Sequence, residues 1–172
     1  DIEKHGGVPV MAAAGHSLIK NKMRETGALL AGEMSGHICF ADNYYGFDDA
    51  IFAACRVLQI VATSKQKVSE MLADLPETAY TPEIRIDCPD ERKFEIVSEL
   101  TETFRKQYDV IDIDGVRVNF EGGWALIRAS NTQPVLVLRL EAVTEERLKE
   151  LVVVIKEQMD KYQPIVKFDY QP

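Results

Sequence analysis

The chain has 172 residues, enough for one ordinary domain or for two small domains that each bury a core. Its hydrophobic fraction of 46% and charged fraction of 28% are typical of a soluble globular protein. The net charge of −8 argues against broad binding to nucleic acid or to anionic membranes, because such binding needs a basic face.

Membrane and secreted proteins are also disfavoured. No apolar run approaches the ~20 residues of a membrane span, and no signal peptide is visible. The three cysteines, Cys39, Cys55 and Cys88, lack metal-like spacing, and an odd count fits a reducing cytosol. We therefore expect a cytoplasmic protein with no metal site in this chain. The start at Asp1, without an initiating Met, resembles a helix end and suggests a fragment.

The first part of the chain alternates strand and helix patterns. Residues 8–12 predict a short buried strand, and residues 16–25 carry a helical spacing that ends at Gly27. Residues 28–31 and 38–41 predict two further strands. Strands alternating with helices indicate an α/β domain, here an incomplete three-layer one that lacks its opening elements.

The next helix is predicted from a cap and an apolar stripe. Asp48 can cap it, and its apolar face consists of Ile51, Phe52, Cys55, Leu58 and Val61. Residues 63–82 are more polar and contain two prolines, with a short helix near 68–72. We expect the domain boundary there, which gives domains 1–75 and 76–172.

The second domain begins with a strand over residues 84–88. Asp90 can cap a helix whose apolar side consists of Phe94, Val97, Leu100, Phe104 and Tyr108. Three strands follow as a meander. Asp114-Gly115 is a strong signal for a two-residue hairpin, and residues 121–123 supply the next turn.

The last strand and helix have the clearest periodicity. One face of the strand carries Leu136, Leu138, Leu140 and Ala142. Thr144 can cap a long helix whose buried stripe consists of Leu148, Leu151, Val152, Ile155 and Met159. The order β-α-β-β-β-α predicts an α+β domain with an antiparallel four-stranded sheet and two helices.

The loop 128–134 between two apolar strands has the composition of a phosphate-binding loop. Arg128 offers a fork of donors that matches phosphate oxygens. Ser130, Asn131 and Thr132 add side-chain donors, and Pro134 stiffens the exit from the loop. An ordinary polar turn that follows a strand arginine is an equally good interpretation of the composition alone.

A second loop, 32–37, suits the hydroxyl groups of a sugar. Gly32 and Gly36 allow the backbone to approach a ligand closely. Between them Glu33 offers acceptors and Ser35 a donor, and His37 follows. A glycine-rich hairpin tip would look similar. Together the two loops describe a phosphosugar site, with the hydroxyl groups at one end and the phosphate at the other.

These motifs resemble the α-D-phosphohexomutases, most closely the bacterial phosphomannomutase/phosphoglucomutase branch. The resemblance covers nearly the whole chain and rests on Gly15-His16-Ser17-Leu18-Ile19-Lys20, the loop 32–37, Tyr45-Gly46-Phe47-Asp48-Asp49 and the loop 128–134. The phosphoglucosamine branch tends to differ at Met34 and at Ser130-Asn131. The resemblance therefore favours mannose and glucose phosphates and leaves open which of the two is preferred.

The resemblance implies a larger enzyme. Such mutases have four domains, and this chain resembles most of the third and all of the fourth. The phosphoserine lies in the first domain, the Mg²⁺ loop lies in the second, and hexose 1,6-bisphosphate is the intermediate. Neither loop occurs in this sequence. The expected partners are hexose phosphates and the missing N-terminal domains, and the chain alone should be inactive.

Within that resemblance Glu33 and Ser35 match sugar-hydroxyl contacts, and Arg128, Ser130, Asn131 and Thr132 match the grip on the distal phosphate. His16 and His37 match positions near the substrate, and His37 is the better candidate for proton transfer. Lys20 shares a helix face with His16 and is equally well read as a solvated lysine. Arg139 could line the phosphate loop. Ala12-Ala13-Ala14 departs from the bulky, basic and Thr residues usual in the family.

Two alternatives remain open at this point. The chain could be a stand-alone phosphosugar-binding module that has lost the catalytic domains. It could also bind nucleic acid on its antiparallel sheet, although the negative charge and the expected absence of exposed aromatics on a basic face disfavour that reading.

Overall fold

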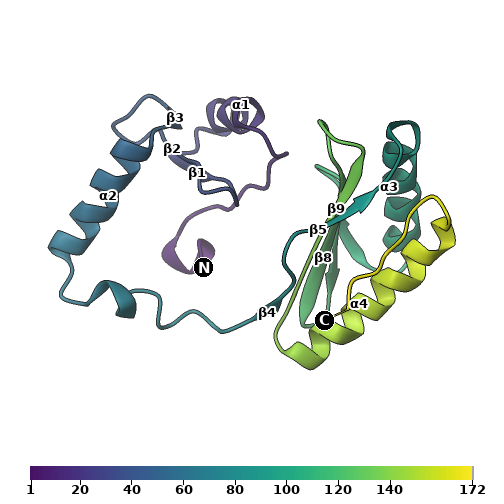
Figure 1. Cartoon of the computed structure of the whole chain (residues 1–172). Helices are drawn as coiled ribbons and strands as arrows, with labels where there is room; N and C mark the ends of the chain where they lie inside the picture. The colour runs from purple at the N-terminus through teal and green to yellow at the C-terminus, as the bar shows by residue number, and fades with distance from the viewer. Residues whose placement is uncertain (172) are drawn as a thin grey trace. The chain divides into compact units, whose positions relative to one another are not determined.

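A computed structural model describes residues 1–171 of the chain. The chain divides into two compact units, Asp1–Leu75 and Pro76–Pro172 (Figure 1). The mixed α/β class and the antiparallel second sheet predicted from the sequence are confirmed.

The first unit contains a small antiparallel sheet of order β1-β2-β3 and two α-helices. Its core is small and consists of Ile19, Met23 and Cys39, with four alanines packed around them. The elements are η1 (Glu3–His5), α1 (His16–Thr26), β1 (Leu30–Gly32), β2 (Ile38–Phe40), β3 (Phe47–Asp48), α2 (Ala50–Thr63) and η2 (Val68–Glu70).

Two strand predictions for this unit need correction. Residues 8–12 form no strand, and Val8 is 86% exposed, because no strand of the described residues lies beside them to complete a ladder. The strand predicted over residues 28–31 begins later, at Leu30. The amide of Ala28 still donates to the carbonyl of Met23 at 3.1 Å, so Ala28 belongs to the end of α1.

The helix α2 is capped by Asp49, not by Asp48 as predicted. The Oδ1 atom of Asp49 accepts hydrogen bonds from the amides of Ile51 and Phe52, both at 2.9 Å. Asp48 lies in β3, opposite Cys39, so its side chain is free for another partner. A capping side chain must stand just before the first helical residue, and Asp49 occupies that position.

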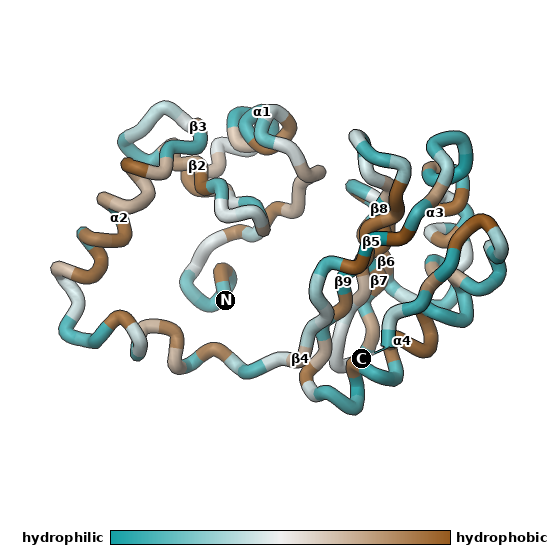
Figure 2. Tube along the Cα trace, viewed as in Figure 1, coloured by the Kyte–Doolittle hydropathy of each residue, from teal (hydrophilic) through white to brown (hydrophobic). Residues whose placement is uncertain are grey.

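The apolar face predicted for α2 is not buried. No residue of this helix is buried, and Ile51 is 79% exposed, although Figure 2 shows apolar residues along most of its length. The helix makes aromatic and ionic contacts: the ring of Phe52 stacks on Tyr44, with centroids 3.8 Å apart, and meets Phe40 edge-on. Arg56 pairs with Asp42 at 2.9 Å.

The second unit is one antiparallel sheet with both helices on the same face (Figure 1). The strand order is β4-β9-β8-β7-β6, and β5 also pairs with β9. The elements are β4 (Ala79–Tyr80), β5 (Ile84–Asp87), α3 (Asp90–Arg105), β6 (Asp109–Ile111), β7 (Val116–Phe120), β8 (Gly123–Ala129), β9 (Val135–Ala142), α4 (Glu145–Met159) and η3 (Asp160–Tyr162). The sheet has six strands, not four. Two short segments, β4 and β5, both pair with β9, and β6 forms an additional edge strand beside β7.

The predicted core of this unit is confirmed at β9 and α4. Every residue of both predicted apolar faces is buried, and the hydroxyl of Thr144 accepts from the amide of Arg147 at 3.1 Å. The prediction for α3 was less accurate. Phe94 is 57% exposed, whereas Ile96 is fully buried. Asp90 lies inside the first turn after Pro89 and pairs with Lys93, so it does not cap the helix.

The connection from β6 to β7 is longer than predicted. The strands pair as far as Ile111 and Arg117, and residues 112–115 between β6 and β7 form the loop in place of a two-residue hairpin. Gly115 has a φ of +80°, and a Cβ atom there would lie 2.3 Å from the carbonyl oxygen of Ile127 and 2.7 Å from the Cα of Arg128. This loop therefore lies directly against the end of β8.

We expect Gly115→Ala to lower the free energy of unfolding by about 3 kcal/mol, because it combines a left-handed backbone with a backbone clash. Urea denaturation measures the loss. Gly122→Ala is the matched control: its φ is +72°, but the nearest atom to a new Cβ is a side-chain carbon of Val143 at 3.3 Å. The control should lose only about 1 kcal/mol. Equal losses would contradict the close approach at Gly115.

The cap of α2 should respond to pH. The hydroxyl of Tyr44, followed by the amide of Phe52, lowers the pKa of Asp49. A carboxyl group with a lowered folded pKa stabilises the fold above its unfolded pKa of about 4, and the stabilisation is lost as the pH falls through the folded value. The amide signals of Ile51 and Phe52 should therefore shift on acidification. Asp49→Asn keeps a neutral cap and should remove this dependence; an unchanged titration in Asp49→Asn would refute the assignment.

Candidate functional site

The loop 32–37 is the tip of the β1–β2 hairpin. Gly32 pairs with Ile38, and the amide of Glu33 donates to the carbonyl of His37 at 2.9 Å. The amide of Gly36 donates to the carbonyl of Glu33 at 3.0 Å. These two backbone hydrogen bonds close the loop, so the side chains between them are held at the end of the hairpin.

The carboxylate of Glu33 is fixed by two donors. Its Oε1 atom accepts from the amide of Gly15 at 3.0 Å, and its Oε2 atom accepts from the hydroxyl of Ser35 at 3.1 Å. The first contact ties the hairpin tip to the start of α1, where His16 is exposed. A carboxylate has about four acceptor positions, so both oxygens can still accept from a hydroxyl group.

His37 pairs with a carboxylate on the neighbouring strand. Its Nδ1 atom lies 3.1 Å from the Oδ2 atom of Asp48, and the ring is exposed. A proton on Nδ1 is favoured by this contact, which leaves Nε2 able to accept or release a proton. Asp48 was proposed from the sequence as a helix cap and is instead the partner that orients His37.

Three charged groups surround the buried thiol of Cys39 on β2. Burial raises the pKa of this thiol, the charges of Asp48 and Glu33 raise it further, and the charge of Lys20 lowers it. Lys20 is half-buried one turn after His16. Lys20 is therefore close enough to Cys39 to influence the pKa of its thiol. The side chains of His16 and Lys20 make no hydrogen bond or ion pair within residues 1–171.

The loop 128–134 is organised by Ser130. This buried residue donates its amide to the carbonyl of Val135 at 3.0 Å. Its hydroxyl oxygen accepts from the amides of Thr132 and Gln133 at 3.4 and 3.2 Å. Asn131 and Thr132 are exposed at the tip. The hydroxyl of Ser130 thus shapes the loop, and its proton stays available for a ligand.

Arg128 has a hydrogen-bonding deficit. It lies at the end of β8, half-buried, with Nη1 3.6 Å from the Oδ2 atom of Asp114. Its Nε atom is buried without a hydrogen-bond partner. A buried donor without an acceptor costs free energy that an incoming anion can recover. The arginine is therefore suited to bind a phosphate oxygen.

Two more arginines share the open face of the sheet with Arg128. The register places Arg139 on β9 and Arg117 on β7 on either side of Leu126, one step along β8 from Arg128. Arg117 was missed, although it alternates with buried Val116 and Val118 in the sequence and so had to lie on the open face.

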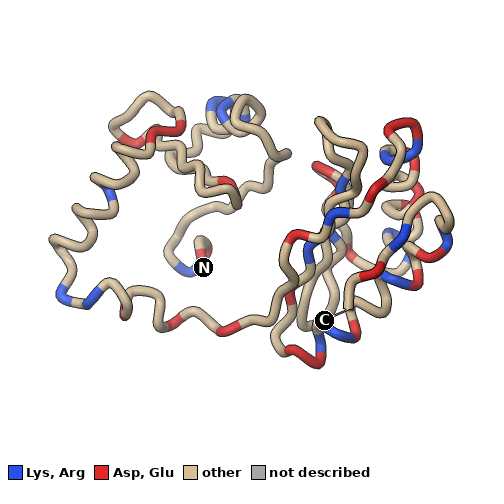
Figure 3. The backbone as a smooth tube through the Cα atoms, viewed as in Figure 1, with Lys and Arg blue, Asp and Glu red and all other residues tan. Residues whose placement is uncertain are grey.

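Arg117 stacks over the ring of Trp124 at 4.8 Å, and Trp124 is half-buried on the same face. One half-buried aromatic side chain therefore lies among the arginines of this face. This face also carries acidic residues, and Figure 3 shows charges of both signs along the second unit.

Side chains outside the predicted set support the second loop. Lys93 donates from Nζ to the carbonyl of Gln133 at 3.0 Å, and Arg85 donates to the side-chain oxygen of the same residue. A lysine on a helix and an arginine on a strand carry no sequence signal for such contacts, because the partner lies about 40 residues away in the chain.

The predicted residues thus form two groups. Glu33, Ser35 and His37 meet at the first hairpin, and the residues of the loop 128–134 meet with Arg139 in the second unit. The two groups belong to different units, so their sharing of one site stays a prediction.

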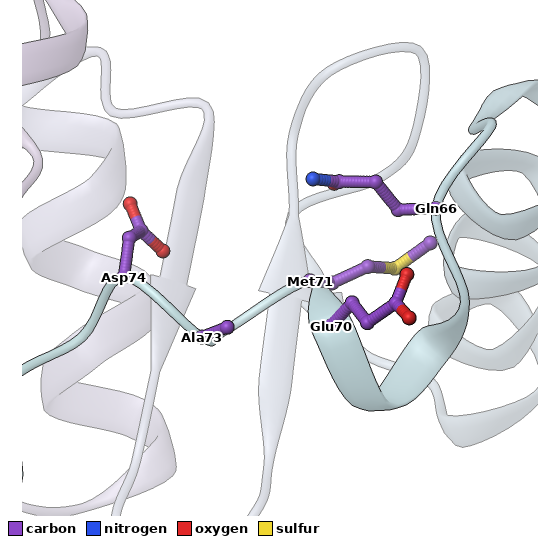
Figure 4. Close-up of a pocket in the computed structure, with 5 residues that line it drawn as sticks. All are labelled: Gln66, Glu70, Met71, Ala73 and Asp74. Carbon is purple, nitrogen blue, oxygen red and sulfur yellow. The ribbon is translucent and has the colours of Figure 1, made fainter.

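Other features add no chemistry to the site. A cavity of about 450 Å³ is lined by Gln66, Glu70, Met71, Ala73 and Asp74, none of them predicted site residues (Figure 4). Among residues 1–171 no cluster of three His, Cys, Asp or Glu could hold a metal ion. Within that same range no helix is both long and apolar enough to cross a membrane.

Family models match the chain in two consecutive segments. Residues 1–79 match "Phosphoglucomutase/phosphomannomutase, alpha/beta/alpha domain III", and residues 83–158 match "Phosphoglucomutase/phosphomannomutase, C-terminal domain". The chain is 45% identical to a phosphomannomutase/phosphoglucomutase of Pseudomonas putida over 98% of its own length and 37% of that protein. It is 44% identical to a phosphoglucomutase of Neisseria gonorrhoeae over 87% of its length and 33% of that protein.

A solved structure is also similar. A phosphoglucomutase/phosphomannomutase family protein from Burkholderia thailandensis matches with a TM-score of 0.84 at 36% identity, over 98% of this chain and 36% of that one. The chain therefore spans about a third of the length of the curated relatives it matches. With two family domains matched in order and this agreement in fold, the chain belongs to the phosphoglucomutase/phosphomannomutase family and carries its domain III and C-terminal domain sequences.

Proposed function

We propose that the chain is the substrate-binding C-terminal part of a phosphomannomutase/phosphoglucomutase. The full-length protein would interconvert hexose 6-phosphate and hexose 1-phosphate through hexose 1,6-bisphosphate. The observation that carries the proposal is Arg128, whose half-buried guanidinium has a buried Nε atom without a partner and stands beside the loop 128–134. A phosphate group supplies the acceptor that this side chain lacks.

The chemistry assigns different tasks to the two loops. Glu33 accepts hydrogen bonds from sugar hydroxyls, and Ser35 donates to them. Arg128, Asn131 and Thr132 bind the distal phosphate. A fixed phosphate grip combined with a tolerant hydroxyl grip would hold the sugar in both of the orientations that phosphoryl exchange at two positions requires. His37, oriented by Asp48, is the proton-transfer candidate.

Mg²⁺ and the phosphoserine belong to the proposed full-length enzyme. The residues described here offer no cluster that fits a metal, so this part of the protein would bind and orient the substrate. It would be inactive alone, and we place the enzyme in the cytoplasm.

Titration of glucose 1-phosphate into ¹⁵N-labelled protein tests the proposal. We expect weak, saturable shifts at the amides of both Glu33 and Thr132, because the ligand carries hydroxyls and a phosphate. Glucose should move only the first signal, and inorganic phosphate only the second. If a single-stranded oligonucleotide causes shifts and glucose 1-phosphate, glucose and phosphate cause none, the proposal is wrong. Nucleic-acid binding on the open sheet face would then replace it.

A chimera separates an enzyme part from a stand-alone binding module. Joined behind the first two thirds of the Pseudomonas putida relative, the chain should convert glucose 1-phosphate into glucose 6-phosphate. A folded chimera that binds the phosphosugar and remains inactive would favour the binding module.

Replacing Glu33 tests the hydroxyl grip. Glu33→Ala removes the acceptor of the Gly15 amide and of the Ser35 hydroxyl, so the Gly15 amide signal should shift and the stability should fall by about 1 kcal/mol. The glucose-dependent shifts should disappear while those caused by phosphate persist. Glu33→Gln keeps one side-chain acceptor, so its stability and its glucose-dependent shifts should lie between those of the parent chain and those of Glu33→Ala. A loss of phosphate shifts in Glu33→Ala would contradict separate tasks for the loops.

A further inference from the structure

We infer that Lys93 is a positioning residue for the phosphate loop, an inference that rests on the proposed phosphate binding. Lys93 lies in the first turns of α3 and is only 4% exposed. Its Nζ atom donates to the carbonyl oxygen of Gln133 at 3.0 Å and to the Oδ1 atom of Asp90 at 2.6 Å. The ammonium also lies 5.1 Å from the ring centroid of Phe94.

The free-energy cost of burying the Lys93 ammonium group has to be compensated by its contacts. Removing it from water is costly, and an apolar side chain of the same size would often make the core more stable. Asp90 is exposed at the surface, so it does not require a buried partner. The contact that an apolar side chain cannot replace is the one to Gln133, which lies inside the loop 128–134.

Hydrogen bonds hold the loop at its ends and around Gln133: the amide of Val135 donates to the carbonyl of Gln133 at 2.9 Å, and the amide of Gln133 donates to the hydroxyl of Ser130 at 3.2 Å. Ser130 holds the entrance, and the amide of Cys88 donates to the carbonyl of Pro134 at the exit, at 2.9 Å. Gln133 is gripped from both faces of the sheet: Lys93 binds its backbone from the helix side, and Arg85 binds its side chain from the open side. These contacts fix the residue that directly follows Thr132.

Fixing Gln133 should keep Asn131 and Thr132 in the conformation that a phosphate needs. A loop ordered before binding loses less conformational entropy when the ligand arrives, which raises the affinity. Without Lys93 the tip would retain its donors, but their order would depend on the hydroxyl of Ser130, the amide of Val135 and Arg85, and no contact from α3 would remain.

The chain supplies a matched control in Lys156. Its Nζ atom also binds a carboxylate close in sequence, Asp160, at 3.0 Å, and a distant backbone carbonyl, that of Phe168, at 3.3 Å. The pair of acceptors is of the same kind, but the Lys156 side chain is 44% exposed and no atom of the loop 128–134 is involved. Substituting each lysine by methionine removes the ammonium and keeps a long apolar stem.

The experiment compares Lys93→Met, Lys93→Arg and Lys156→Met in the whole 172-residue chain. Glucose 1-phosphate is titrated into each ¹⁵N-labelled protein, and the heteronuclear NOE of Asn131 and Thr132 is measured without ligand. We expect Lys93→Met to weaken binding about tenfold, because side chains of a loosened tip would have to be ordered when the ligand binds. The NOE should fall at both residues. Lys93→Arg, which keeps the charge and the donors, and Lys156→Met should stay within about twofold of the parent.

Several results would overturn the inference. The first is that Lys93→Met binds glucose 1-phosphate as tightly as the parent chain and shows unchanged loop order. The second is that Lys156→Met loses as much affinity as Lys93→Met, which would indicate general destabilisation. Lys93→Met leaves behind an exposed aspartate and the carbonyl of Gln133, which still accepts from the amide of Val135, so the variant should fold. Lys93→Gln is the second variant, with the same expectation. If the parent chain shows no shift at Thr132, the proposed function fails, and the order of the ligand-free loop still decides the role of Lys93.

Discussion

The antiparallel pairing of β8 with β9 is the constraint on which the second unit depends. The register that places Ile127 opposite Leu138 in the core also places Arg128 opposite Val137 on the open face. A slip of one residue would exchange the two faces, so the apolar core and the arginines are specified by the same pairing. The loop 130–134 is the closure of this hairpin, and its position follows from strands that are fixed by burial. The position of this candidate loop is therefore tied to the strand pairing that builds the core.

Both candidate loops use a side chain to satisfy backbone amides and keep binding capacity in reserve. In the first unit the carboxylate of Glu33 accepts from the amide of Gly15. In the second unit the hydroxyl of Ser130 accepts from two amides of its own loop. Each oxygen atom has more than one lone pair, or a proton to donate, so a ligand can be bound without breaking the contacts that shape the loop. This arrangement reduces the entropy lost on binding.

The sequence predicts an element correctly where its apolar periodicity matches the burial in the structure. β9 and α4 were predicted residue by residue, because their apolar faces have no competing solution. It fails where two neighbouring residues could both cap a helix, as with Asp48 and Asp49. It also fails where tertiary contacts decide which apolar side chain is buried, as with Phe94 and Ile96. The contact of Lys93 with Gln133 depends on residues 40 apart in the chain, and a lysine on a helix is usually solvated. The candidate site residues lie in local motifs that the sequence displays, whereas Lys93 and Arg85, which contact the second loop from distant segments, carry no such signal.

The net charge of −8 and the binding of an anion are compatible because electrostatic fields act locally. Arg117, Arg128 and Arg139 surround Leu126 on the open face, so a single phosphate group near Arg128 meets mainly positive charge. An extended polyanion would have to continue along the same sheet. There the register brings Glu141 beside Trp124, and Asp109 at the far edge. Beyond the arginines, each further phosphate would therefore meet carboxylates. The arrangement of charge on this face is thus better suited to the proposed binding of a compact anion than to a nucleic-acid backbone.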